Sequence, residues 1–288
     1  MISSAFMVVA GISTAGVGVA RLGSEAEDHS SAASPTPAVR VSPTPDPLVV
    51  ARAHINAYVA RLGGHLTLAV VDRQGGAGAT AGARPFETAS IVKVDILAAL
   101  LLRQQTRGRT LSRDARRLAT NMIVTSDNGA ASTLWQEIGK SQGLAAANRT
   151  FGLQETTPSL HWGLTRTTAA DQVRLLDALV NPDGPLNPES RRFLLDLMSR
   201  VDSSQRWGVA AAAGPDSVQS YVKNGWDTAS DDNGRWLINS IGRIVEPDHD
   251  WLIAVLSDHH RSQREGIRIV EEAIKYALRE LRAASSAS

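Results

Sequence analysis

The stretch of sequence that decides the fold covers residues 218–257 and reads VQSYVKNGWDTASDDNGRWLINSIGRIVEPDHDWLIAVLS. Three segments in it are rich in β-branched and aromatic residues, namely Val218–Lys223, Trp236–Val245 and Trp251–Ser257. Gly, Asn, Asp and Pro residues separate them. Because those residues favour turns and the segments favour extended chain, the stretch predicts three consecutive strands of an antiparallel sheet.

Helical patterns lie on both sides of these strands. Leu48–Leu62 has apolar residues at helical spacing, and Glu265–Leu281 closes the chain with a second such pattern. His65–Asp72 is typical of an earlier strand, and helix signals dominate from Thr88 to Ser204. This order predicts a mixed α/β protein of the α+β kind, an antiparallel sheet flanked by terminal helices with an inserted helical lobe. A cleft between lobe and sheet is then the natural place for a site.

Two segments precede this predicted domain. Residues 1–20 carry no charged side chain and are typical of the apolar part of a signal peptide, with cleavage before Arg21. Their length also suffices for an uncleaved membrane anchor. Residues 21–46 are rich in Ser, Ala and Pro, which predicts a disordered linker. We therefore expect an exported protein, secreted or extracytoplasmic and associated with the cell envelope, whose folded domain covers residues 47–284.

The composition excludes several classes of function. The 288 residues carry a formal net charge of +1 without a block of like charge, so neither nucleic acid nor a membrane surface is favoured as a partner of the folded domain. The absence of cysteine excludes disulfides, a thiolate zinc site and a cysteine nucleophile. Only four of the 30 basic side chains are lysines, and two of them, Lys93 and Lys223, lie in motifs. An amine can lose its proton and a guanidinium cannot, so these two are candidates for proton transfer.

Two Ser-x-x-Lys motifs occur, Ser90–Lys93 and Ser220–Lys223. Ser90 precedes a run of good helix formers, and on a helix residues three apart share a face, so its hydroxyl and the Lys93 amine can meet. Ser220 and Lys223 lie in a strand pattern, where a separation of three points the side chains to opposite faces. A serine hydroxyl needs an adjacent base to become a good nucleophile, and lysine can be that base when its pKa is lowered. The first motif alone suits a nucleophile and its base, although Ser90 is also a plausible helix cap.

Two further motifs have an ordinary structural interpretation beside a functional one. Ser126-Asp127-Asn128 is typical of a helix cap, but it also offers a second hydroxyl for proton relay and an amide for a substrate carbonyl. Lys223-Asn224-Gly225-Trp226 contains the Asn-Gly pair of tight hairpins. It also offers a lysine at the cleft edge for a substrate carboxylate, a glycine that lets the backbone approach substrate, and an N–H of Trp226 for an oxyanion hole.

Taken in order, Ser-x-x-Lys, Ser-Asp-Asn and Lys-x-Gly resemble the signature of class A β-lactamases and penicillin-binding proteins over roughly residues 47–281. The resemblance implies an acyl-serine mechanism, with Ser90 as nucleophile, Lys93 as base and Ser126 as proton relay. It implies a structural role for Asp127 and a substrate-binding role for the remaining motif residues, namely Asn128, Lys223, Asn224, Gly225 and Trp226.

The sequence departs from that family between Phe151 and Thr165. Class A enzymes carry there an omega-shaped loop with a glutamate that activates water for deacylation, and this loop is largely deleted here. Glu155 is the only carboxylate in the gap, and an ordinary loop charge is its preferred interpretation. Asn224 stands where the family usually has a hydroxyl residue, and an amide cannot pass a proton. We therefore expect β-lactams to be bound rather than rapidly destroyed.

The remaining chemistry-bearing residues are weaker candidates. Trp162 and Trp226 are plausible cleft residues, whereas ordinary packing is expected for Trp207 and Trp236. His259-His260 has no third spaced ligand, so we expect solvated loop residues there and no metal. No cofactor is expected.

These observations predict a serine hydrolase that acts on an amide, ester or β-lactam carbonyl. Its substrate would be a small molecule or peptide with a carboxylate, such as a β-lactam or a peptidoglycan-like peptide. The alternative is a catalytically inactive protein of the same fold that binds cell-wall peptides.

Overall fold

The computed structural model describes residues 45–229 and 232–287. The predicted signal peptide or anchor (1–20) and nearly all of the predicted linker (21–46) lie outside the described residues, so both stay predictions, as do the domain boundaries. Among the described residues no helix is both long and apolar enough to span a bilayer.

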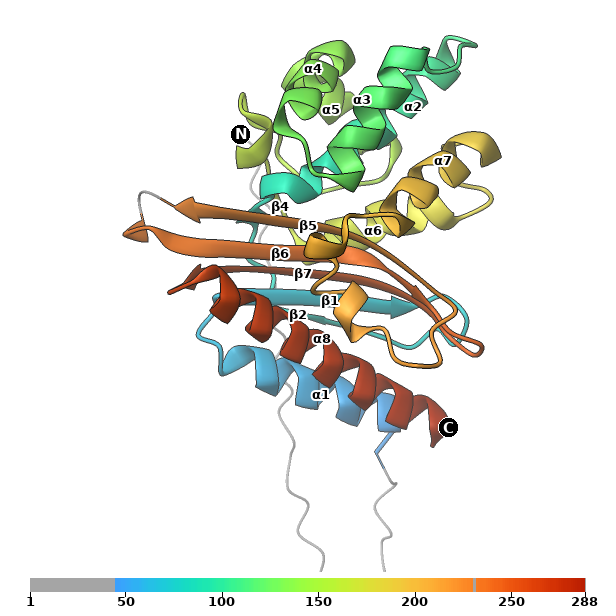
Figure 1. Cartoon of the computed structure of the whole chain (residues 1–288). Coiled ribbons are helices and arrows are strands. Elements are labelled where there is room, and N and C mark those ends of the chain that lie inside the picture. Colours follow the sequence, from blue (N-terminus) through green and yellow to red (C-terminus); the bar gives the residue numbers. More distant parts are fainter. Residues whose placement is uncertain (1–44, 230–231, 288) are drawn as a thin grey trace, which may run out of the picture. The chain divides into compact units, whose positions relative to one another are not determined.

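Figure 1 colours the helices and strands of the described chain in sequence order. The helices are α1 Pro47–Ala60, α2 Val92–Thr106, α3 Arg113–Val124, α4 Asn128–Ile138, α5 Lys140–Thr150, α6 Ala169–Val180, α7 Pro188–Ser199 and α8 Gln263–Ser286. The strands are β1 Leu66–Asp72, β2 Gly78–Ala81, β3 Phe86–Glu87, β4 Arg166–Thr167, β5 Gln219–Ala229, β6 Arg235–Val245 and β7 Asp250–His260. Single 3₁₀ turns are η1 Ala89–Ile91, η2 Trp162–Leu164, η3 Ser203–Gln205 and η4 Ala210–Ala212.

The main sheet has five strands in the order β2-β1-β7-β6-β5, and every neighbouring pair is antiparallel. Helices α1 and α8 cover one face, while the helical lobe formed by α2 to α7 lies on the other (Figure 1). The prediction of an antiparallel sheet with terminal helices and an inserted lobe is therefore confirmed. Strand β5 is an edge strand, and it runs past the start of α2.

Strand β5 corrects the prediction that the first late strand ends at Lys223. It continues to Ala229, and Asn224 and Gly225 pair with Ser240 and Asn239 of β6 in the middle of the ladder. The hairpin lies instead beyond β5, where Asn233 and Gly234 adopt the left-handed backbone (φ 53° and 71°). A second Asn-Gly pair thus supplies the turn, because it is the one placed where the two long strands can pair along their full lengths.

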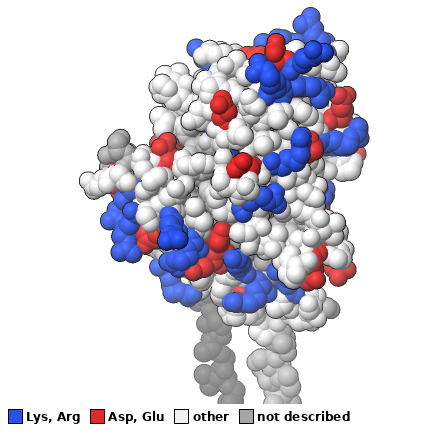
Figure 2. Space-filling view, viewed as in Figure 1, with Lys and Arg blue, Asp and Glu red and all other residues white. Residues whose placement is uncertain are grey.

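The surface carries both signs of charge in close mixture. Figure 2 shows acidic and basic side chains interspersed over the face in view, with basic ones gathered over the α2–α3 turn. Part of that charge is neutralised locally, since Arg116 pairs with Glu189 and Arg117 with Asp114. With a formal net charge of +1 for the whole chain, the face in view has no dominant sign of charge.

Helix α2 is the centre of the lobe and is buried from Val92 to Leu101. Two charged residues, Lys93 and Asp95, lie within this buried run. Asp95 accepts a hydrogen bond from the amide of Gln172 on α6 (3.3 Å), and burial raises the pKa of Asp95 to about 7. The carboxyl therefore carries a proton in the folded chain at a pH where an exposed aspartate has lost it.

Replacing this carboxyl by the isosteric amide is expected to remove a pH dependence of stability. Between the ordinary pKa of 3.8 and about 7 the folded chain binds more protons here than the unfolded chain. The free energy of unfolding therefore falls as pH rises through that window, and it stays lower above it. Asp95→Asn lacks this fall, so its stability relative to wild type should rise by about 2 to 4 kcal/mol between about pH 4 and about pH 8. Urea unfolding at both pH values measures this difference. The same relative stability at both would contradict it, and exposed Asp183→Asn serves as control.

Candidate active site

Ser90 lies in the 3₁₀ turn η1, directly before α2. Ala89 before it has a left-handed backbone (φ 44°), which is unfavourable for a residue with a Cβ atom. Ser90 is half-buried and lines the cavity described below. The strained residue and the tight turn together present the Ser90 side chain at the cavity rather than within the packed start of α2.

Lys93 lies one turn further along and is fully buried. Its Nζ donates to the Ser126 backbone oxygen (2.6 Å), to Ser126 Oγ (3.0 Å) and to Asn128 Oδ1 (2.7 Å). The ammonium also lies 5.0 Å from the ring centre of Trp162. Burial lowers the pKa of Lys93 to about 8, and the charge of Asp127 opposes this shift. Ser90 Oγ and Lys93 Nζ, both in the described chain, form no direct hydrogen bond, so the expected contact is replaced by contacts to the Ser-Asp-Asn motif.

The Ser-Asp-Asn motif occupies the junction between α3 and α4, as its capping pattern predicts. Ser126 has a left-handed backbone (φ 60°), and Asp127 caps α4 by accepting a hydrogen bond from the Ala130 N–H (2.5 Å). This turn directs Ser126 Oγ toward two lysines, because Lys223 Nζ on β5 also donates to it (3.0 Å). With both lone pairs of Oγ occupied, its own proton is free to be donated elsewhere.

Lys223 is fully buried rather than at the open edge of the cleft, which corrects its expected position. It donates to the Asn224 backbone oxygen (2.9 Å) as well as to Ser126. Burial lowers the pKa of Lys223 well below its usual range, and the nearby charge of Lys93 lowers it further. The amine therefore acts on the site through Ser126.

Gly225 of β5 and Asn239 of β6 both lie against the turn that carries Ser90. A Cβ atom on Gly225 would lie 2.7 Å from the Thr88 backbone oxygen and 2.9 Å from the Ser90 nitrogen. The glycine thus lets β5 approach the Ser90 turn, while its role in letting the backbone approach substrate stays a prediction. Asn239 on β6, which the sequence did not single out, donates to the backbone oxygens of Glu87 (2.8 Å) and Thr88 (3.1 Å). In the sequence, the only sign of this role of Asn239 is an amide side chain within a predicted buried strand.

Asn224 does not belong to the cavity wall, which corrects its predicted substrate-binding role. Its side chain is fully buried, and its Nδ2 donates to the backbone oxygens of Gln205 (2.7 Å) and Trp207 (3.1 Å). Since side chains alternate along a strand, Asn224 faces away from Lys223 and Gly225. It anchors the loop that follows α7.

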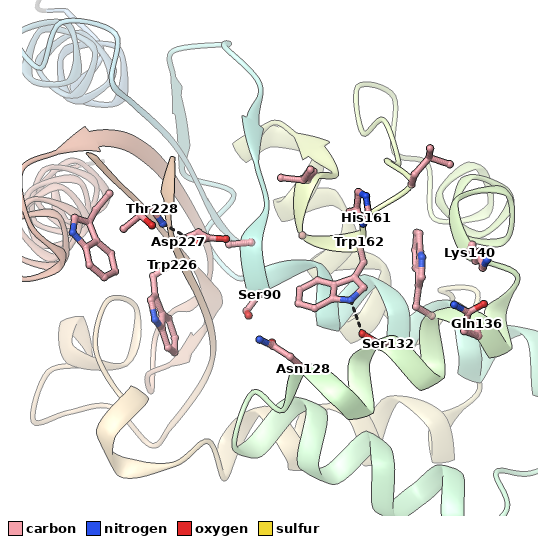
Figure 3. A pocket seen from close by; sticks show the side chains of 16 residues that line it. Ser90, Asn128, Ser132, Gln136, Lys140, His161, Trp162, Trp226, Asp227 and Thr228 are labelled. Carbon is pink, nitrogen blue, oxygen red and sulfur yellow. Dashed lines mark hydrogen bonds between the residues drawn. The ribbon is translucent and has the colours of Figure 1, made fainter. Parts of the chain in front are cut away.

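The cavity beside Ser90 has a volume of about 820 Å³ (Figure 3). Asn128, Trp162 and Trp226 line it, as predicted for the two tryptophans. Trp236 lines it too, which corrects the expectation of ordinary packing, and Trp135 joins them. Trp207 packs edge-on against Trp226, with ring centres 6.0 Å apart, as expected. Aromatic rings therefore form much of the wall around the Ser90 hydroxyl.

The segment between α5 and α6 sends no carboxylate into this cavity. The Glu155 carboxylate accepts a hydrogen bond from Thr168 Oγ1 (3.1 Å). It is an exposed charge in a loop, as expected from the sequence. Asp171 organises the segment from beneath, accepting hydrogen bonds from Gln154 N, Glu155 N and Thr156 Oγ1. A glutamate-activated water at this side of Ser90 therefore has no candidate among the described residues.

His259 and His260 end strand β7, so they are not loop residues. His259 is exposed and stacks on His65, while His260 is buried and contacts Ser257 Oγ through Nε2 (2.9 Å). No cluster of three or more metal-ligating side chains occurs within residues 45–229 and 232–287.

The fold is that of the class A β-lactamases. A class A β-lactamase from Mycobacterium abscessus has a TM-score of 0.66 at 19% identity, over 80% of this chain and 98% of that one. A point mutant of PBP-A, solved as an acyl-enzyme complex with penicillin G, has a TM-score of 0.69 at 19% identity, over 83% of this chain and 99% of that one. The chain belongs to the beta-lactamase enzyme family, whose sequence model matches residues 102–280. That match begins within α2, after Ser90 and Lys93.

Curated proteins also match the chain. The putative lipoprotein LppW of Mycobacterium bovis and Mycobacterium tuberculosis is 28% identical over 210 residues. The aligned region covers 69% of this chain and 64% of those proteins. The chain thus spans less than two thirds of the length of the relatives it matches.

Proposed function

We propose that this protein is an extracytoplasmic serine hydrolase that forms an acyl-enzyme at Ser90. The observation that carries the proposal is the convergence of two buried lysines, Lys93 and Lys223, on the single hydroxyl of Ser126 beside the Ser90 cavity. Two amines on one hydroxyl are costly to bury for stability alone, and they join Lys93, Ser126 and Lys223 in one hydrogen-bonded chain that can carry a proton. The similarity to a protein named a putative lipoprotein supports the location.

Acylation follows from the chemistry of these groups. A neutral Lys93 takes the Ser90 proton, and Ser90 Oγ attacks the substrate carbonyl. The developing oxyanion is bound by the N–H groups of Ser90 and Trp226, which the close approach at Gly225 supports. Collapse of the tetrahedral intermediate breaks the bond to the leaving group. The proton passes from Lys93 to Ser126, whose own proton goes to the leaving atom.

Asn128 and Ser126 bind the substrate during this step. Asn128 Oδ1 accepts from Lys93, which leaves its Nδ2 free to donate to a substrate carbonyl, and Figure 3 shows that nitrogen on the Ser90 side. Before its proton moves to the leaving atom, the Ser126 hydroxyl, backed by two lysines, donates that proton in a hydrogen bond to a substrate carboxylate on the leaving-group side. Hydrolysis of the acyl-enzyme is slow, because no carboxylate from the segment between α5 and α6 lines the cavity.

Peptide mapping after exposure to penicillin G tests the proposal. Trypsin separates the three candidate serines, since Ser90 falls in residues 74–93, Ser126 in 118–140 and Ser220 in 207–223. We expect a single adduct, on the peptide with Ser90, that persists for minutes. An adduct on either other peptide would overturn the assignment. Absence of any adduct with penicillin G and with a panel of activated esters would favour the inactive binding protein.

The rate of acylation should depend on pH through the base. Because the pKa of Lys93 lies at about 8, the neutral amine that accepts the Ser90 proton is scarce at lower pH. The acylation rate constant is therefore expected to rise about tenfold per pH unit below that value and to level off above it. Stopped-flow or quenched mass spectrometry measures it. A rate that is flat between about pH 6 and about pH 9 would contradict this role of Lys93.

A further inference from the structure

Among the described residues that line the Ser90 cavity, Asp227 is the only one with a carboxylate. It lies two residues beyond Gly225 on β5, so the strand's alternation places it on the same face as Gly225 and Lys223. Figure 3 shows its side chain on the strand side of the cavity, across from Trp162. Lys223, Gly225 and Asp227 thus follow one another along the same face of β5.

The charge of Asp227 has no counterion among the described residues. Within the described chain, the only hydrogen bond to its carboxylate comes from the backbone N–H of the next residue, Thr228 (2.8 Å). The carboxylate forms no ion pair with a described Lys, Arg or His. The one lysine that lines the cavity, Lys140, lies on the far side of Trp162 (Figure 3). Asp227 is exposed, so the carboxylate is available to a ligand in the cavity.

The surroundings of Asp227 favour a cation. Trp226 precedes it, and Trp236 pairs with Thr228 across the β5–β6 ladder, and both tryptophans line the cavity. The side chains of both tryptophans leave the ladder on the face opposite to that of Asp227, so it is the charge of the unpaired carboxylate that attracts an ammonium group. A metal ion is not favoured, since the described residues hold no cluster of three ligands.

The position of Asp227 along β5 indicates whether its carboxylate lies on the acyl side or on the leaving-group side of a bound substrate. Lys223 contacts Ser126, which serves the leaving group, and Gly225 lies against Ser90. Asp227 therefore lies past Ser90 on the side of the acyl group, about 7 Å along the strand from Gly225 at the usual rise per residue. The four-carbon stem of a lysine side chain covers such a distance.

We propose that the cavity selects acyl donors with a protonated primary amine, on a stem about as long as that of lysine, and that Asp227 binds this amine. This specificity rests on the proposed acyl-enzyme function. The favoured substrates would therefore carry a cationic acyl half and a leaving group that binds at Ser126.

Binding without reaction is the first test. In a Ser90→Ala chain, tryptophan fluorescence follows binding of the Nα-acetyl methylamides of lysine, norleucine and 2-aminoadipate, each in both configurations. We expect the lysine ligand to bind about tenfold more tightly than norleucine, and aminoadipate to bind most weakly. Adding Asp227→Asn should abolish the preference. Asp183→Asn, which removes an exposed charge outside the cavity, should leave it intact.

Acylation is the second test, with thioesters of the same three acyl groups and one common thiol. In the chain with Ser90 intact, the lysyl thioester should acylate about tenfold faster than the norleucyl one, and Asp227→Asn should slow only the lysyl reaction. Equal slowing of all three thioesters would overturn the amine site, because it would make Asp227 a general catalytic or structural group. Heat unfolding of Asp227→Asn checks that the fold is kept.

The two tests separate the two proposals. If the binding test shows a charge preference that Asp227→Asn abolishes, but no thioester acylates Ser90 in the second test, the amine site is supported and the acyl-enzyme is overturned. Acylation at Ser90 without a preference for the lysyl group overturns the amine site and leaves the acyl-enzyme standing.

Discussion

Lys93→Met is expected to slow acylation of Ser90 about a thousandfold, since a positioned general base contributes about 10² to 10⁴ in rate. The methionine keeps an unbranched side chain in the same buried space but cannot accept a proton. The two hydrogen bonds that Lys93 donates to Ser126 are lost as well, so the link for proton transfer from Lys93 to Ser126 Oγ is broken. Quenched mass spectrometry of the penicillin adduct measures the rate.

The same substitution should not destabilise the fold. Burial lowers the pKa of Lys93 from 10.5 to about 8, so the folded chain binds this proton less well than the unfolded chain. The free energy of unfolding therefore falls as pH drops from 10.5 to about 8, and it stays lower at neutral pH. Methionine removes that cost, about 3 kcal/mol at neutral pH, which offsets the hydrogen bonds lost at Ser126 and Asn128.

Lys275→Met is the matched control, because Lys275 is exposed on α8 and makes only a long contact with Glu271 (3.9 Å). Neither its acylation rate nor its unfolding free energy should change measurably. If Lys93→Met unfolded more readily than wild type at neutral pH, Lys93 would be a structural residue. If it acylated at the wild-type rate, another group would be the base.

The order of elements and the motif positions could be predicted because they depend on local chemistry. Ser126 and Asp127 are good capping residues, and they do lie between α3 and α4. The apolar run after Ser90 becomes the buried face of α2. Such signals act within a few residues, so composition and periodicity reveal them without knowledge of the fold.

Contacts across the chain could not be predicted in this way. Asn224-Gly225 has the chemistry of a turn, but the pairing of β5 with β6 overrides that preference and places both residues inside the sheet. Asn224 then turns to the loop after α7, and Asn239 acquires a role at the Ser90 turn. Which buried amide meets which backbone oxygen depends on strand register, and a single sequence does not give this register.

Gly225→Ala is expected to lower the acylation rate about a hundredfold, because displacement of an oxyanion-hole donor costs about 10² to 10³ in rate. The added Cβ would lie within 2.9 Å of backbone atoms of Thr88, Ser90 and Ile91. Those atoms cannot move freely, since Asn239 holds the Thr88 oxygen from the other side (3.1 Å). The strand must therefore move away from Ser90, and stability should fall by about 1 to 3 kcal/mol.

Two other glycines separate the site effect from the steric one. Gly214→Ala has no heavy atom within 4 Å of its added Cβ, so both rate and stability should stay as in wild type. Gly242→Ala overlaps the Tyr221 backbone oxygen at a distance from Ser90, so it should destabilise the chain without slowing the folded fraction. Rates are compared on folded protein, with the folded fraction taken from circular dichroism. If Gly225→Ala lost stability as Gly242→Ala does but acylated at the wild-type rate, the strand backbone beside Ser90 would have no part in binding the oxyanion.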